Sequence, residues 1–200
     1  MPTVTSSSGR SAEPSLHISF VRHGATAPNL AGLRCGGDLD VPLTDIGRVQ
    51  AELAATRVLA LGQPVGIIVT GALQRTQETA SIISHLLGGV QVVTDAAFDE
   101  RRLGAWNLLP INATEPWFVQ RLRPPGGEAD DDFTQRIANA ARALLPRLHE
   151  PLLLVASKGV ARVFGELLGQ AQRVNCGNGE LKQFDLSPLA LLDEAARCTA

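Results

Sequence analysis

The feature that most constrains this fold is the alternation of short apolar segments with longer helical ones. The segment 65–70 contains three consecutive β-branched residues, Ile67, Ile68 and Val69, and is typical of a buried strand. The segment 73–87 follows it, with apolar residues at helical spacing. Strands are predicted at 16–21, 65–70, 90–93, 152–156 and 182–186. Helices are predicted at 49–61, with Thr44 as the N-cap before Asp45, and at 73–87, 130–148 and 160–168. This alternation predicts an α/β domain with a mainly parallel sheet.

Chain length and charge limit the class of protein. The 200 residues are enough for one compact domain, which we expect at 15–200 after a disordered leader at 1–14 that is rich in Ser, Gly, Pro and Thr. A net charge of -2 argues against binding to nucleic acid. The apolar runs are too short to span a membrane. The three cysteines show no disulfide or metal-ligand spacing, which favours the reducing cytoplasm.

Two predicted strands end in motifs that can carry chemistry. Arg22-His23-Gly24 follows the strand 16–21, and Ser157-Lys158-Gly159 follows the strand 152–156. Ligands of open α/β sheets bind beyond the carboxyl ends of the strands. A histidine can act as nucleophile, acid, base or metal ligand, and an arginine beside it suits phosphate. No histidine of the chain has a metal-site spacing, so we predict no metal and no cofactor.

Further segments carry recognisable motifs in a fixed order. They are the RHG tripeptide within 21–26, Asn29, the D-x-P-L-T-x-x-G stretch at 40–47, the helix start at 70–80, the blocks at 98–100 and 104–106, and P-G-G-E at 125–128. In this order they resemble the histidine phosphatase (phosphoglycerate mutase-like) superfamily over roughly residues 16–170. The resemblance implies a three-layer α/β/α sandwich and a metal-independent phosphohydrolase that acts on a small phosphorylated substrate.

The resemblance also implies roles for individual residues. His23 is expected to attack phosphorus and to form a phosphohistidine, with its other ring nitrogen donating to a backbone carbonyl. Glu100 is expected to protonate the leaving oxygen and then to activate water. Glu78 and Asp99 lie nearby in the sequence and are alternatives for the acid. The phosphate-binding set is expected to be Arg22, Gly24, Asn29, Arg75, Lys158 and Gly159.

Lys158 departs from the family pattern, because a second histidine normally occupies this position. The stretch from Lys158 to Arg162 is also one residue shorter than the family motif, so Arg162 need not match its arginine. An ammonium can supply the charge and the donors of an imidazolium from a longer and more flexible stem. Lys158 is therefore expected to support catalysis, with a weakened or inactive phosphate-binding site as the alternative.

The sequence leaves two other functions open. A phosphomutase ranks below a phosphatase, because the chain has no long insertion to enclose a bisphosphate. A regulatory phosphate-binding protein is the non-enzymatic alternative. Residues 105–125 are expected to shape substrate specificity, and Trp106, Trp117 and Phe118 form either an apolar lid or ordinary core.

Overall fold

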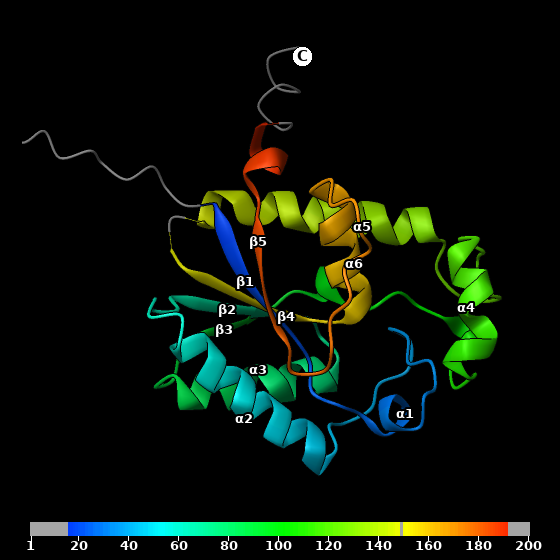
Figure 1. Cartoon of the computed structure of the whole chain (residues 1–200), viewed down its shortest axis with the longest axis horizontal. Coiled ribbons are helices and arrows are strands. Elements are labelled where there is room, and N and C mark those ends of the chain that lie inside the picture. Colours follow the sequence, from blue (N-terminus) through cyan, green and yellow to red (C-terminus); the bar gives the residue numbers. More distant parts are fainter. Residues whose placement is uncertain (1–15, 149, 192–200) are drawn as a thin grey trace, which may run out of the picture.

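The computed structural model describes residues 16–148 and 150–191, so the predicted leader at 1–14 lies outside it. Figure 1 shows the elements in chain order. The strands are β1 (His17–Arg22), β2 (Ile67–Thr70), β3 (Val92–Thr94), β4 (Leu152–Ala156) and β5 (Leu181–Asp185). The α-helices are α1 (Ala27–Leu30), α2 (Asp45–Leu59), α3 (Gln74–Leu86), α4 (Ile111–Val119), α5 (Asp130–Leu144) and α6 (Lys158–Leu167). Three short 3-10 turns are η1 (Ala96–Phe98), η2 (Gly104–Trp106) and η3 (Leu145–Arg147).

The strands form one sheet in the order β3-β2-β4-β1-β5. The first four are mutually parallel, and β5 runs antiparallel to β1 at the edge. In the β1–β4 register Arg22 lies opposite Ala156, so these two strands end side by side. The segments that follow them, at His23 and at Lys158, therefore begin at the same edge of the sheet.

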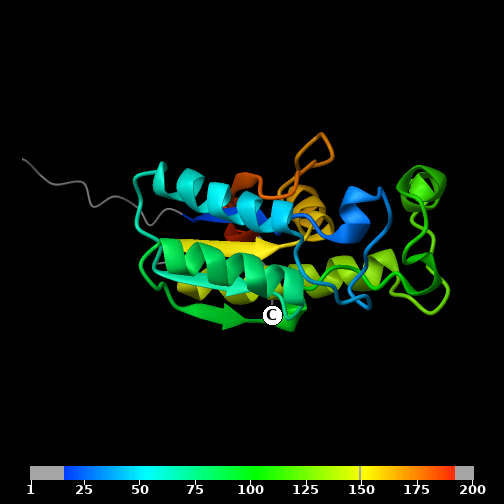
Figure 2. The same cartoon turned by 90° about the horizontal axis from the view of Figure 1, so that it is seen from below.

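Alternate residues of the strands pack into two separate cores. Phe20, Leu152 and Leu154 belong to the core that also contains α5 and α6. Val21 and Leu153 point to the opposite face and pack with α2 and α3. Figures 1 and 2 show these two helix pairs on opposite sides of the sheet. Because strand side chains alternate between faces, helices on both sides explain the nearly continuous apolar runs of β2 and β4. The predicted three-layer α/β/α sandwich is confirmed.

The ends of two predicted helices have local causes. The expected N-cap at Thr44 is confirmed: α2 begins at Asp45, because the Thr44 hydroxyl accepts a hydrogen bond from the amide of Gly47 at 3.1 Å. α5 ends at Leu144, since Pro146 in the following 3-10 turn cannot continue the α-helical hydrogen bonds.

Two helices were not predicted, and both lie beyond the carboxyl ends of β1 and β4 (Figure 1). α1 occupies part of a segment that reads as loop, and α4 forms although Pro116 lies inside it. Among the described residues, no helix has the length and hydropathy needed to cross a lipid bilayer.

Candidate active site

His23 lies directly after β1 and is only 4% exposed. Its Nδ1 lies 2.7 Å from the carbonyl oxygen of Gly24. A carbonyl can only accept, so Nδ1 carries the proton and Nε2 keeps the lone pair. Burial, together with the charges of Arg75 and Arg22, holds the pKa of His23 well below its ordinary value. The ring is thus a neutral base whose free nitrogen can act as a nucleophile.

Two arginines, half-buried Arg22 and fully buried Arg75, lie close enough to act on this ring. The Nη1 atom of Arg22 donates to the carbonyl of Cys176 at 2.8 Å, and burial lowers the pKa of its guanidinium. Arg75 is fully buried in α3 and donates to the carbonyls of Leu39 and Gly36 at 2.9 and 3.1 Å. Within the described chain the Nε atoms of both arginines are buried without a hydrogen-bond partner. Buried donors with unused capacity fit an anionic ligand.

Gly24 allows the loop after β1 to approach α2 closely. Its amide donates to the hydroxyl of Thr79 at 3.1 Å, so it does not face an open phosphate cradle. A side chain at Gly24 would overlap with the backbone carbonyl of Gly47 in the first turn of α2. Phosphate binding at Gly24 stays a prediction, although its amide has a partner within the protein here. The glycine is required because the loop after β1 packs directly on α2.

Glu100 is held at the start of α6. Its Oε2 accepts from the amide of Gly159 at 2.9 Å, and its Oε1 accepts from the amide of Arg101 at 2.8 Å. The first amides of a helix have no partner within the helix, so this carboxylate supplies one. A side chain at Gly159 would overlap with the Glu100 carboxylate. Gly159, expected to bind phosphate, thus gives its amide to the candidate acid.

The two alternative acids have other partners. Glu78, on α3, accepts from the side-chain Nε2 of Gln74 at 2.7 Å and lies 3.5 Å from Arg48 of α2. Asp99 accepts from the amide of Ala72 at 2.7 Å, and burial raises its pKa. Of these three acids, Glu100 is the one that lines the cavity described next.

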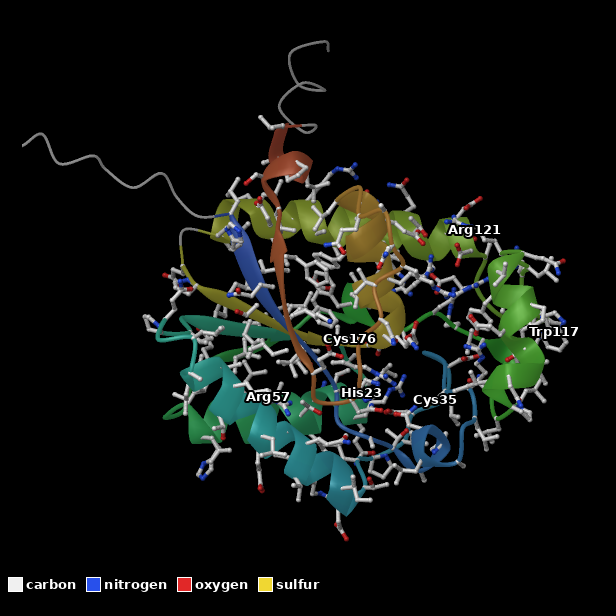
Figure 3. The ribbon with its side chains drawn as sticks, viewed as in Figure 1. His23, Cys35, Arg57, Trp117, Arg121 and Cys176 are labelled. Atoms are coloured by element: carbon white, nitrogen blue, oxygen red, sulfur yellow. The ribbon has the colours of Figure 1, made fainter. Side chains whose placement is uncertain are left out.

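A cavity of about 450 Å³ opens beyond the carboxyl ends of β1 and β4. The predicted site residues Arg22, Asn29, Glu100, Lys158 and Gly159 all line it. His23 and Arg75 are buried and are not among the residues that line the cavity. Figure 3 labels His23 at the end of β1, below Cys176 in this view. The structure thus brings both strand-end motifs to one concavity.

Asn178 is a residue of this site that the sequence analysis missed. Its Nδ2 donates to the carbonyl of His23 at 3.0 Å and to Oδ1 of Asn29 at 3.2 Å. Oδ1 of Asn29 also accepts from the amide of Thr26 at 3.3 Å. Because its oxygen is used, Asn29 keeps its NH₂ group available for an acceptor in the cavity. Asn178 is separated from Asn29 by 149 residues, so no local pattern could have indicated this contact.

α4 and its neighbours form the outer wall of the cavity. Trp106 contacts Trp117 and Phe118, with ring centroids 5.0 and 5.6 Å apart. The guanidinium of Arg34 lies 3.9 Å from the centroid of Phe118 and donates to Thr114 at 2.7 Å. Phe118 lines the cavity, whereas the two tryptophans do not. The aromatic cluster therefore supports the wall, and only one of its rings faces the ligand space.

No group of three or more His, Cys, Asp or Glu side chains that could hold a metal ion occurs in the described part of the chain. The charged groups of the site are arginines, one lysine and carboxylates held by amides or by arginines. This set suits an oxyanion ligand.

Comparisons with known proteins agree with this geometry. Residues 18–197 match the sequence profile of the histidine phosphatase superfamily (branch 1). The chain is 34% identical over 186 residues to a protein of Yersinia enterocolitica named "Probable phosphoglycerate mutase GpmB", with 85% of each covered.

Two solved structures show the same fold. A mycobacterial glucosyl-3-phosphoglycerate phosphatase in complex with VO3 superposes with a TM-score of 0.69 at 30% identity, covering 84% of this chain and 91% of that one. YhfR of Bacillus stearothermophilus superposes with a TM-score of 0.70 at 23% identity, covering 84% and 89%. The chain belongs to the histidine phosphatase superfamily.

Proposed function

We propose that this protein hydrolyses a small phosphomonoester without a metal ion, through a phosphohistidine at His23. The observation that carries the proposal is the hydrogen bond of 2.7 Å between Nδ1 of His23 and the carbonyl of Gly24. It leaves Nε2 unprotonated, and the low pKa of the ring keeps it so. Nucleophilic catalysis requires this state of the imidazole.

In the first step, Nε2 of His23 bonds to phosphorus while the bond from phosphorus to the ester oxygen breaks. Arg22 and Arg75 offset the charge on the phosphoryl oxygens. The carboxyl group of Glu100, protonated for this step, transfers its proton to the departing oxygen. In the second step, Glu100 takes a proton from water as the water oxygen bonds to phosphorus. The N–P bond then breaks, which releases inorganic phosphate and restores neutral His23.

The name of one relative supports phosphatase chemistry. The mycobacterial structure at 30% identity is described as a glucosyl-3-phosphoglycerate phosphatase, and it was solved with VO3. Vanadate resembles a phosphoryl group in the transition state of its transfer. We therefore expect vanadate to inhibit this protein in competition with the substrate.

A mutase is the second candidate, because the Yersinia relative is named a probable phosphoglycerate mutase. A mutase returns the phosphoryl group to an organic acceptor, whereas a phosphatase gives it to water. Incubation with a phosphoglycerate separates the two: release of inorganic phosphate supports the phosphatase, and an isomeric phosphoglycerate supports the mutase.

The decisive experiment traps the intermediate. The protein is mixed with a radiolabelled aryl phosphate in the presence of EDTA and quenched in alkaline detergent. We expect label on the protein that survives alkali and is released by mild acid, as the N–P bond of a phosphohistidine requires. His23→Ala should show no label, and Glu100→Gln should accumulate label because water attack is slowed. Hydrolysis without label, or label that remains in His23→Ala, would contradict the proposal, as would loss of activity in EDTA.

A further inference from the structure

The cavity wall carries more positive charge than the transferred phosphoryl group requires. Arg34, Lys158 and Arg173 line it in addition to Arg22. Two carboxylates also line it: Glu100 is held by backbone amides, and Glu115 lies 2.8 Å from Arg34 and 3.0 Å from Arg173. Each oxygen of Glu115 is taken by one arginine. Three cations thus share a single carboxylate, and two positive charges are left over.

Two other arginines of the wall do not add to this surplus. Arg101 and Arg162 both line the cavity, but they lie 3.1 and 2.9 Å from the buried carboxylate of Asp130. Arg162 also pairs with Glu166 at 2.8 Å. Arg101 and Arg162 thus have Asp130 and Glu166 as partners, which they share with Arg121. Among the described residues, Arg34, Lys158 and Arg173 have only Glu115 beside them.

Lys158 is the unpaired member of the set. Over residues 16–148 and 150–191, its ammonium forms no ion pair and no side-chain hydrogen bond. Burial and the charges of Arg22, Arg173 and Arg34 lower its pKa, and Glu115 opposes that shift. An unpaired cation among other cations in a concave, partly dry site is unfavourable unless an anion occupies the space.

Lys158 is grouped with the cations of the cavity wall. It is the first residue of α6, while the amide of the next residue, Gly159, is bound to Glu100. Its ammonium lines the same cavity as Arg34 and Arg173, and the charges of both arginines act on it.

We propose that Lys158, with Arg34 and Arg173, forms a second anion site, and that the preferred substrate is a phosphomonoester whose leaving group itself carries a carboxylate or a phosphate. This assignment rests on the proposed function, since it places the first phosphoryl group at His23. Leu33, Phe118 and Val174 line the same cavity and provide apolar contact for the carbon frame between the two anions. Lys158 is then a specificity residue, and the lost family histidine is not simply replaced.

The test measures binding, so it does not depend on turnover. Three benzylphosphonates share the group that imitates the phosphate and differ at ring position 4, which carries a carboxamide, a carboxylate or a second phosphonate. Their affinities are measured by calorimetry for the full chain and for Lys158→Gln, Lys158→Arg and Arg142→Gln. Arg142 lies near the end of α5, about 18 Å along the helix from Asp130, and serves as the matched loss of one charge.

We expect the unmodified protein to bind the carboxylate and the bisphosphonate about 10- to 100-fold more tightly than the carboxamide. Lys158→Gln should reduce this preference by about tenfold while changing carboxamide affinity less than about threefold. Lys158→Arg should restore the preference, and Arg142→Gln should leave it unchanged. The second anion is identified as carboxylate or phosphate by which of the two charged ligands gains more affinity over the carboxamide.

Three results would overturn the proposal. Equal weakening of all three ligands in Lys158→Gln would mean that Lys158 acts on the phosphoryl group at His23. Equal affinity of the unmodified protein for the carboxamide and the carboxylate would exclude a second anion site. Absence of binding by any phosphonate would overturn both this site and the proposed function. Selective binding without any hydrolysis of the corresponding phosphates would reject the hydrolase alone and keep the anion site.

Discussion

The protonation state of His23 is an energetic property of the folded protein as well as a catalytic one. The ring is 4% exposed, and burial with two neighbouring guanidinium groups lowers its pKa. In the unfolded chain the same ring titrates near its ordinary pKa of about 6.5. Below that pH, His23 binds a proton in the unfolded state but stays neutral in the folded state. The free energy of unfolding therefore falls as the pH falls.

This difference predicts a measurable loss of stability. Between pH 7.5 and pH 5.5, His23 should reduce the free energy of unfolding by about 1.4 kcal/mol. His23→Gln cannot bind that proton, and it should therefore lose about 1.4 kcal/mol less than the unmodified protein over the same interval. Urea unfolding of both proteins at the two pH values measures the difference. Equal losses in the two proteins would show that His23 titrates normally when folded.

Asn178 shows how a residue outside every motif enters the site. One amide group holds the carbonyl of His23 and the oxygen of Asn29 at once. Asn178 lies in the segment before β5. In the same segment, the carbonyl of Cys176 accepts a hydrogen bond from Arg22, and the carbonyl of Gly179 accepts one from Arg57. The loop of the nucleophile is thus held on one side by α2 and on the other by a segment more than 150 residues away in the chain.

At the scale of elements, α6 links the two halves of the candidate mechanism. Its first residue is Lys158, and the amide of its second residue holds Glu100. The helix dipole favours a carboxylate at this end. Only glycine at position 159 leaves room for it. The start of one helix therefore positions both a cavity-lining cation and the candidate acid.

Gly159→Ala tests this link. The added methyl group would displace the carboxylate of Glu100, so proton transfer to the leaving oxygen should fail. We expect kcat/KM to fall about 100-fold for an alkyl phosphate, whose leaving oxygen needs the proton. For p-nitrophenyl phosphate, which leaves as a stable anion, the change should stay within about threefold.

A double variant supplies the control for this experiment. If Gly159→Ala acts only through Glu100, it should add little to the defect of Glu100→Gln. A similar loss for both substrates, or additive losses in the double variant, would instead indicate that the whole site is disturbed.

At the scale of the whole molecule, the sequence predicted most of the framework. The β-branched and apolar runs marked β2 and β4, since strands covered on both faces must be apolar throughout. Each of the five predicted strands overlaps with an observed one, although β3 and β5 are largely exposed or polar. The motifs at the ends of β1 and β4 were expected to converge, because parallel neighbours end at the same edge of the sheet.

The remaining features depend on contacts that are distant in sequence. α4 contains Pro116, so its pattern did not indicate a helix. It is held instead by Arg34, through Thr114 and Glu115. The tasks of Gly24 and Gly159 follow from the backbone or side chain that packs against each glycine, and neither is visible in its local sequence.

One buried ion network joins several of these distant parts. Asp130, at the start of α5 and 5% exposed, lies 3.1 Å from Arg101, beside Glu100, and 2.9 Å from Arg162 on α6. Arg101 also donates to the carbonyls of Glu128 and Leu122. The network connects the layer formed by α5 and α6 to the loop of the candidate acid and to the segment after α4. Removing its central charge leaves two largely buried guanidinium groups without their shared partner.

Asp130→Asn should therefore destabilise the protein by about 3 kcal/mol, since breaking a buried pair is costly. For a chain of this size that corresponds to a fall in Tm of roughly 6–12 °C. Asp131→Asn is the matched control, because Asp131 is exposed in the same first turn of α5 and its change alters the helix dipole interaction similarly. Thermal unfolding of both variants separates the two effects. Equal and small changes in Tm would show that the arginines find other partners, in which case the network does not couple α5, α6 and the loop of Glu100.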